Sequence, residues 1–142
     1  MRPPVVGWGE DDGSFPVRFG WQGTRDPAAF LAVPAAIDFQ AEHAWDEVRS
    51  RCHALAEEGR LRLAELTGIE PIAPDERWLG QMVATRLPDC DAAELKRRLY
   101  DDHRIEIPVE GRRGQPIVRA SFQAYNDGSD LEALLAALRK LL

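Results

Sequence analysis

The stretch from residue 43 to residue 67 places the strongest limit on how this chain can fold. Its apolar side chains recur at alternating steps of three and four residues, which is the spacing of one face of an α-helix. The members of this face are Trp45, Val48, Cys52, Leu55, Gly59, Leu63 and Leu66. Gly68 follows, and glycine is the residue type that most often ends a helix. A long helix with a single apolar face needs a second layer to pack against.

Strand-like stretches downstream predict that second layer. We expect strands at about 81–87, at 104–109, and in VRASFQAYND from residue 118, which runs into a helix cap by residue 127. In the last two strands apolar and polar side chains alternate, and the turn EGRRG between them favours an antiparallel hairpin. Pro108 indicates that 104–109 is an edge strand or contains a bulge.

Two further helices complete the pattern. DAAELKRRLYDD, at 91–102, follows the capping residues 89–91, and DLEALLAALRKLL, at 130–142, follows the capping residues 126–129. The fold class is therefore α/β (α+β). We expect a two-layer unit with a small, largely antiparallel sheet covered by helices, preceded by two helices.

The N-terminal part has a different character. The first 25 residues are rich in Gly, Pro and aromatic residues without periodicity, and we expect an irregular, docked segment. A helix is predicted from Asp26-Pro27, with a kink or interruption at Pro34. Because its run is apolar nearly all round, it should be buried or lie at an interface. We place the domain boundary between 1–42 and 43–142.

Composition narrows the possible partners. The net charge of -6 and the pI of about 5.1 argue against nucleic acid, and the pairs Arg97-Arg98 and Arg112-Arg113 are interpreted as a solvated helix face and a turn. The chain has no apolar stretch of about 18 residues, so no membrane partner is expected. Cys52 and Cys90 are expected to be free thiols in a reducing cytoplasm.

The residues that could carry chemistry are few. His43, His53 and His103 are scattered without metal-ligand spacing, so no metal site is predicted. Gly23-Thr24 stand just before a predicted helix, where backbone N–H groups favour an anion. The alternative is simple capping, because the carboxylate of Asp26 can satisfy the same donors.

Arg119 is the second candidate. It lies near the start of a half-buried strand, on the face shared with Ser121, Gln123 and Tyr125. A guanidinium suits a carboxylate bidentately. The alternative is a structural ion pair with Glu106 across the hairpin, and the residues alone leave both readings open.

Two motifs resemble a known family. VRASFQAYN resembles the arginine motif in the small domain of class V aminotransferase-family enzymes, and WQGTRDPAAFLAVPAAIDF resembles their Gly-Thr segment in the isopenicillin N epimerase-like branch. RIEIPV, shortly before the arginine strand, fits that branch too. The similarity covers nearly the whole chain in the right order.

The resemblance implies a pyridoxal 5′-phosphate enzyme of fold type I, usually a homodimer, with a large cofactor domain and a small C-terminal domain. It implies that Arg119 binds the α-carboxylate of an amino-acid substrate. It implies that Thr24, in the segment with Gly23, contacts the cofactor phosphate, typically from the neighbouring subunit. Gln22 and Arg25 lie beside Thr24 and are tentative members of the same site.

Departures from the family pattern qualify this expectation. Family members hold the cofactor on a lysine of the large domain, whereas the two lysines here, Lys96 and Lys140, lie in a charged helix run and near the C-terminus. The large domain's aspartate for the pyridine nitrogen has no matching segment either. We therefore expect the C-terminal part of such an enzyme, with no catalytic residue of its own and inactive without a large-domain partner.

The loop before the arginine strand narrows the reaction. Cysteine desulfurases carry a reactive cysteine there, but DDHRIEIPVEGRRG has none and Cys90 comes too early. A desulfurase is therefore disfavoured, while epimerase (isomerase), lyase and transaminase reactions stay open. The alternative class is a non-catalytic α/β dimerisation or interaction domain derived from such an enzyme.

Overall fold

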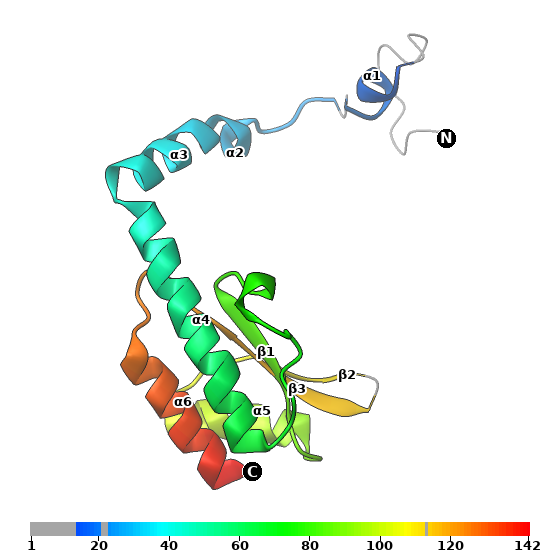
Figure 1. The fold of residues 1–142 in the computed structure, drawn as a ribbon. Coiled ribbons are helices and arrows are strands. Elements are labelled where there is room, and N and C mark those ends of the chain that lie inside the picture. Colours follow the sequence, from blue (N-terminus) through cyan, green and yellow to red (C-terminus); the bar gives the residue numbers. More distant parts are fainter. Residues whose placement is uncertain (1–13, 21–22, 113) are drawn as a thin grey trace. The chain divides into compact units, whose positions relative to one another are not determined.

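The structure is a computed structural model of the 142-residue chain, and it describes residues 14–20, 23–112 and 114–142. The chain divides into two compact units, Met1–His43 and Ala44–Leu142. Short helices make up the described part of the first unit, and a sheet with three long helices makes up the second (Figure 1).

The first unit contains α1 (Phe15–Gly20), α2 (Ala28–Leu31) and α3 (Val33–Glu42). Helix α1 corrects the prediction that the first 25 residues are wholly irregular; six residues are too few for helical periodicity to be visible. The predicted interruption of the helix from Asp26-Pro27 is confirmed, because α2 ends at Leu31 and Pro34 lies in the first turn of α3. Proline is tolerated there, where its missing N–H would have no helical partner.

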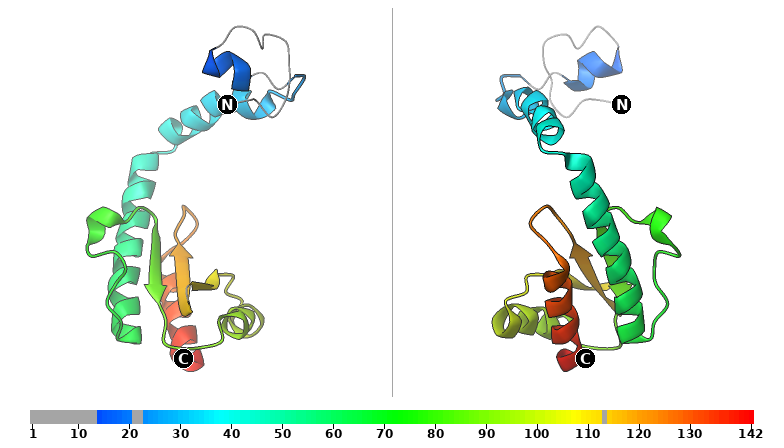
Figure 2. Two further views of the ribbon diagram at one scale, coloured as in Figure 1. Left: turned by 90° about the vertical axis from the view of Figure 1, so that its right-hand side faces the viewer. Right: turned by 60° about the vertical axis from the view of Figure 1, so that its left-hand side comes forward.

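The second unit is built on a three-stranded antiparallel sheet in the order β1-β3-β2. The strands are β1 (Met82–Arg86), β2 (Val109–Arg112) and β3 (Gln115–Ser121). β3 is central, since its residues pair with β1 on one side and β2 on the other (Figure 2). The predicted hairpin of β2 and β3 is confirmed, and Gly114 at its turn has φ +82°, in the left-handed region that favours glycine.

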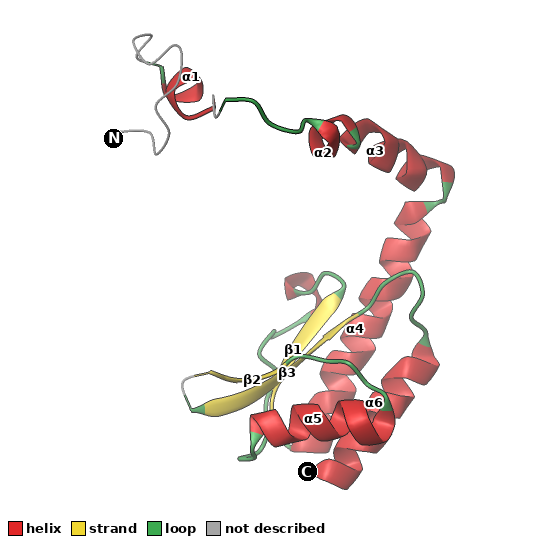
Figure 3. Ribbon diagram, turned by 180° about the vertical axis from the view of Figure 1, so that it is seen from behind, coloured by secondary structure: helices red, strands yellow, loops and turns green. Residues whose placement is uncertain are grey.

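The other layer consists of α4 (Trp45–Thr67), α5 (Ala92–His103) and α6 (Gly128–Leu141). α4 packs on β1 and β3, α5 packs on β2, and α6 contacts both helices (Figure 3). The strand residues that face these helices are buried, including Val83, Thr85, Val118 and Ala120. The alternate residues of β1 and β3 point to the opposite face, which no described helix covers. The predicted two-layer α/β architecture is therefore confirmed.

The predicted apolar face of α4 forms the centre of the core. Cys52, Leu55, Gly59 and Leu63 are all buried. Gly59 lets the helix approach the sheet closely, because a Cβ at this position would lie 3.3 Å from Cγ1 of Val83. Gly68 ends α4 in the left-handed conformation, as its residue type predicts.

The predicted strand at 104–109 is wrong in its bounds. Helix α5 continues to His103, Arg104 ends it in the left-handed conformation, and β2 begins only at Val109. The alternation was real, because Ile107 and Val109 are buried while Glu106 is exposed. Pro108 accepts a hydrogen bond from the N–H of Arg119 at 3.1 Å but has no N–H to donate in return, so strand pairing does not extend past it.

Helix caps form where the sequence predicts them. Asp91 Oδ1 accepts hydrogen bonds from the N–H groups of Ala93 and Glu94, each at 3.0 Å. Asp127 and Asp130 form a reciprocal capping box at the start of α6. Among the helices of the described residues, none is both long enough and apolar enough to cross a bilayer.

Candidate functional site

Arg119 lies near the middle of the central strand and is exposed on the uncovered face of the sheet. Its partner in β1 is Ala84, whose small side chain leaves space beside the guanidinium. The buried neighbours Val118 and Ala120 anchor the strand from the other face. The alternation that predicted an outward-facing arginine is confirmed.

The guanidinium of Arg119 makes no ion pair or hydrogen bond with any residue that the structure describes. The predicted alternative, an ion pair with Glu106, is therefore not formed. The register explains why: Pro108, not Glu106, lies beside Arg119 on the next segment. The arginine is thus available to a ligand.

Arg119 borders two hollows. A groove of about 560 Å³ lies between residues 103–108 and the segment 119–134, and we call it the Arg119 groove. Its polar lining consists of His103, Arg104, Glu106, Arg119, Ser121, Tyr125, Asn126 and Asp130. A second hollow of about 190 Å³, lined by Ile72, Ala84, Pro108, Glu110, Ile117 and Arg119, lies on the open face of the sheet.

The chain after β3 is held firmly beside the groove. Gln81 and Phe122 exchange two hydrogen bonds, of 2.7 and 3.1 Å, and Arg51 donates to the carbonyl of Ala124 at 3.0 Å. Asn126 Oδ1 accepts from the N–H of Gln123 at 2.9 Å. Tyr125 is nevertheless 84% exposed in this fixed segment.

Apart from Arg119, no polar residue that lines the groove was predicted as a site residue, and Tyr125 and Arg104 show why. Alternation along the strand places Tyr125 on the same face as Arg119, so the sequence contains a signal for this residue. The predicted strand at 104–109 includes Arg104 and gives its side chain no role in a site. Only the end of α5 at this residue brings Arg104 to the same groove as Arg119.

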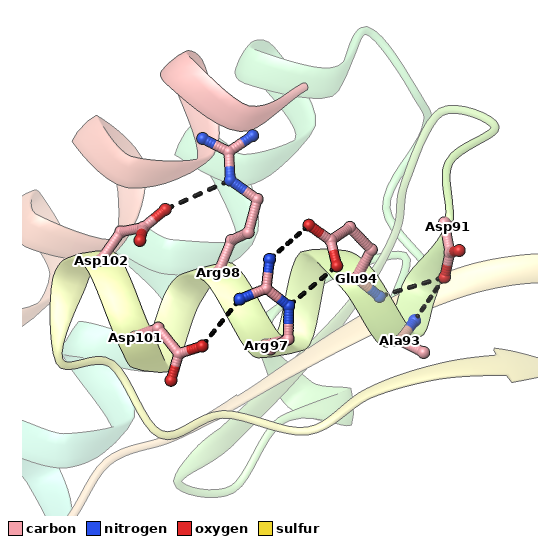
Figure 4. A network of polar contacts seen from close by, with 7 residues as sticks. All are labelled: Asp91, Ala93, Glu94, Arg97, Arg98, Asp101 and Asp102. Atoms are coloured by element: carbon pink, nitrogen blue, oxygen red, sulfur yellow. Dashed lines mark hydrogen bonds and ion pairs between the residues drawn. The ribbon is translucent and has the colours of Figure 1, made fainter.

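Unlike Arg119, the two arginines of α5 donate hydrogen bonds to carboxylates of their own helix (Figure 4). Arg97 donates to Glu94 at 2.6 and 2.9 Å and to Asp101 at 2.8 Å, and Arg98 donates to Asp102 at 3.2 Å. The hydrogen bond from Arg97 holds the pKa of Glu94 below its usual value. The interpretation of Arg97-Arg98 as a solvated, paired helix face is confirmed.

The Gly-Thr segment lies in the first unit. Gly23 has φ +81°, a left-handed conformation that favours glycine, and Thr24 after it is exposed. Asp26 Oδ1 accepts from the N–H of Ala28 at 2.9 Å, so the predicted alternative of capping does occur. The guanidinium of Arg25 lies 5.0 Å from the ring centroid of Phe30. Gln22 lies outside the described residues.

The hydroxyl of Thr24 has no hydrogen-bond partner among the described residues. This fits a donor for a phosphate oxygen, but a single hydroxyl is only one of the several donors that a phosphate requires. The four-residue helix α2 adds little dipole, and Asp26 already takes one of its N–H groups. The Gly-Thr segment is therefore suited to complete a phosphate site rather than to form one.

Neither described cysteine, Cys52 or Cys90, is activated as a nucleophile. Cys52 is fully buried and Cys90 is partly buried, and both are free, as predicted. Burial, with smaller effects of Asp89 and Asp91, raises the pKa of Cys90 above its ordinary value. A raised pKa disfavours the nucleophilic thiolate. In the described part of the chain, no three His, Cys, Asp or Glu side chains come together as a metal site would require.

Comparison with known proteins agrees with both motifs. The family described as aminotransferase class-V matches residues 13–134, which include the Gly-Thr segment and Arg119. The chain belongs to the class V aminotransferase family. The resemblance inferred from the sequence is thereby confirmed.

Several curated relatives share this family membership. The chain is 41% identical to isopenicillin N epimerase of Amycolatopsis lactamdurans and 37% identical to that of Streptomyces clavuligerus, over 99% of its own length in each case. It is 33% identical over its full length to a putative L-cysteine desulfhydrase of Oryza sativa subsp. japonica. The chain spans 39%, 40% and 34% of these three relatives, so more than half of each lies outside the matched region.

Proposed function

We propose that this chain is the small-domain part of a pyridoxal-phosphate-dependent amino-acid enzyme, similar to isopenicillin N epimerase, and that it binds the substrate carboxylate. The observation that carries the proposal is Arg119, an arginine without an internal partner at the border of two hollows, in a chain of the class V aminotransferase family. The domain division is 1–42, belonging to the large-domain or dimer region, and 43–142, the small domain.

Arg119 has the chemistry for this role. Its guanidinium presents a planar fork of donors that matches the two oxygens of a carboxylate. Both edges of β3 are hydrogen-bonded, so the backbone that carries the arginine is fixed before a ligand arrives. Such preorganisation lowers the entropy lost on binding.

The cofactor contact in this proposal is limited. Thr24, with Gly23 shaping its backbone, would donate to a phosphate oxygen of pyridoxal phosphate, and Gln22 and Arg25 are tentative neighbours. The cofactor, when bound, supplies the electron sink that weakens bonds at the substrate α-carbon. The protein's contribution here is to orient the carboxylate and one phosphate oxygen.

A large-domain partner completes the enzyme in this proposal. Lys96 and Lys140 are both exposed on helices and neither lines the Arg119 groove. We therefore infer that the cofactor lysine comes from a large domain and that the chain alone is catalytically silent. The family resemblance implies that the complete enzyme is a homodimer, and the free thiols Cys52 and Cys90 favour a reducing cytoplasm. An epimerase reaction is favoured by the names of two relatives, and a lyase reaction by the name of the third.

The first test uses the purified chain with pyridoxal phosphate. We expect no cofactor to be fixed to the chain after borohydride reduction, as measured by intact mass. A stoichiometric mass increase on Lys96 or Lys140 would refute the assignment of the lysine to another part of the enzyme.

The second test joins the chain to the part of the Amycolatopsis relative that lies outside the match. Arg119→Gln should raise the substrate Kd about tenfold or more and leave cofactor binding unchanged, because only the carboxylate contact is lost. Arg139→Gln is the matched control, since Arg139 lies on α6 outside the groove. Equal loss of substrate and cofactor binding would contradict the carboxylate role.

A second candidate function rests on a separate observation. The apolar side chains of α2 and α3 are exposed, among them Phe30, Leu31, Val33, Ile37 and Phe39. A non-catalytic domain that associates with another chain through these helices would cover them. Sedimentation velocity over a range of concentrations distinguishes the two: self-association that is lost in Ile37→Asp, without cofactor or substrate binding, would favour this candidate.

A further inference from the structure

We propose that Arg104 is a second anion-binding residue of the Arg119 groove. The ligand class is then an amino acid whose side chain carries a second carboxylate. This inference rests on the proposed function, because it takes Arg119 as the site of the first carboxylate.

The pairing of arginines in the second unit carries the proposal. Eight described arginine side chains there donate to a carboxylate or to a backbone carbonyl, namely Arg49, Arg51, Arg60, Arg62, Arg77, Arg86, Arg97 and Arg98. Arg104, Arg119 and Arg139 make no such bond to a described residue. Two of these three line the same groove. A groove with two guanidiniums that lack internal acceptors is suited to a ligand with two anionic groups.

The backbone at Arg104 adds a second reason. Its φ of 59° and ψ of 30° put it in the left-handed region, at the helix end where glycine is the usual residue. Glycine would relieve this conformation, and the guanidinium gains nothing from the described residues around it. Strained non-glycine residues of this kind cluster at ligand sites.

The described acids of the groove form no ion pair with Arg104 or Arg119. Asp130 is engaged in the α6 cap, where its Oδ2 accepts from the amide of Asn126 at 3.0 Å and from the N–H of Asp127 at 3.2 Å. Glu106 is exposed and has no partner among the described residues. Its carboxylate can accept a hydrogen bond from an N–H group of a ligand. Arg104, Arg119 and Glu106 thus match a ligand with two carboxylates and an N–H donor.

The groove is large enough for such a ligand. Its volume of about 560 Å³ lies within the range of about 300–1,000 Å³ that is typical of small-molecule sites. Arg104 and Glu106 come from the segment between α5 and β2, whereas Arg119 comes from β3 (Figure 3). The ligand would therefore lie across the groove, from the sheet toward the end of α5.

The experiment measures ligand binding to the full 142-residue chain by NMR. The probes are the dicarboxylates glutarate, adipate and pimelate, each compared with the monocarboxylate of the same carbon count: valerate, hexanoate and heptanoate. We expect the best dicarboxylate to bind about tenfold more tightly than its matched monocarboxylate, because a second charge-assisted contact forms. Dicarboxylates that bind no more tightly would overturn the inference.

Variants assign that preference to a residue. Arg104→Gly should reduce it to within about twofold while leaving the chain equally or more resistant to thermal unfolding, because glycine suits a φ of 59°. Arg104→Gln should also remove the preference, and Arg139→Gln, the control, should retain it. A preference that survives in Arg104→Gly would contradict the role of Arg104.

Arg119→Gln separates this inference from the proposed function. If Arg119 holds the first carboxylate, this variant loses the monocarboxylates as well as the dicarboxylates. Loss of both in Arg119→Gln, with no change in Arg104→Gly, would refute only the second position. Unchanged monocarboxylate binding in Arg119→Gln, or no binding of either acid to the native chain, would contradict the proposed function itself.

Discussion

The two units of the chain differ in how they treat apolar side chains. In Ala44–Leu142, residues such as Leu63, Leu99 and Leu135 are completely buried between the helices and the sheet. In the first unit no residue of α2 or α3 is buried, and Ile37 is 61% exposed. The second unit therefore closes its own core, whereas the described helices of the first unit carry apolar surface that only another chain or segment can cover.

The sequence pattern is the cause of this difference. Each helix of the second unit has one apolar face, and the sheet and the neighbouring helices are enough to bury that face. The segment that forms α2 and α3 is apolar on nearly all sides. Two short helices cannot bury all of these sides between them, so apolar side chains stay exposed.

The largest effect is expected in the core. Leu135→Ala should lower the free energy of unfolding of the second unit by about 2–5 kcal/mol, through lost apolar burial and the cavity left behind. Ile37→Ala should change it by less than about 0.5 kcal/mol. Urea denaturation followed by circular dichroism measures both, and similar losses would mean that Ile37 is covered in solution.

Close packing at Gly59 should give the next largest effect. In Gly59→Val the new Cβ alone would lie 3.3 Å from Val83 and 3.6 Å from Phe122, so the larger side chain should cost about 1–3 kcal/mol by overpacking. Ala54→Val, on the exposed side of the same helix, should cost only the small difference in helix propensity. Equal thermal unfolding of the two variants would contradict the close approach of α4 to β1.

Most of this packing was predictable from the sequence, because helix periodicity survives in side chains that meet one partner layer. The faces of α4 and α6 and the outward direction of Arg119 all followed from local spacing. Local spacing does not give strand register. The interpretation of 104–109 as a strand failed because Arg104 still ends α5 in the left-handed conformation and Pro108 has no N–H for strand pairing, so β2 begins only at Val109. Only the register showed that Arg119 lies beside Pro108 rather than Glu106.

Prediction of the site residues was limited in the same way, because local spacing does not show which residues meet in space. Residue type and position made the Gly-Thr segment and Arg119 candidates, but only the resemblance gave them definite roles, since an exposed arginine and a capping threonine have many ordinary uses. Arg104 was missed because its importance depends on a left-handed backbone and on a groove shared with Arg119, neither of which is encoded in neighbouring residues.

A helix cap compares the two units on a smaller scale. Asp91→Ala should destabilise the second unit by about 1 kcal/mol, because Asp91 accepts from two N–H groups at the start of α5. Asp26→Ala removes a similar bond in the first unit and should not change the unfolding of the second. A shift of the main denaturation midpoint by Asp26→Ala would show that the units unfold together.

The smallest expected effect is the loss of folding stability at acid pH. Arg60 holds the pKa of Glu57 below its ordinary value of 4.5, and Arg62 does the same for Glu132, which links α4 to α6. The folded state therefore binds fewer protons than the unfolded state. The stabilisation is present above about pH 4.5 and is lost as the pH falls through the lowered pKa values.

Thermal unfolding at a series of pH values measures this effect. Glu57→Gln should flatten the acid limb more than Glu132→Gln, because the pair of Glu57 with Arg60 is the less exposed of the two and solvent screens it less. The reverse order would mean that the link between the helices dominates.

The central position of β3 has one more consequence, for the motion of Arg119. Amide hydrogens in a strand that is paired on both sides exchange with solvent only in rare, large openings, unlike those of a fraying edge or terminus. The Arg119 backbone should therefore belong to the slowest-exchanging group of the chain. The position of the guanidinium can then change only by rotation about its own side-chain bonds, not by movement of the strand. For an exposed side chain this rotation occurs on the picosecond-to-nanosecond timescale.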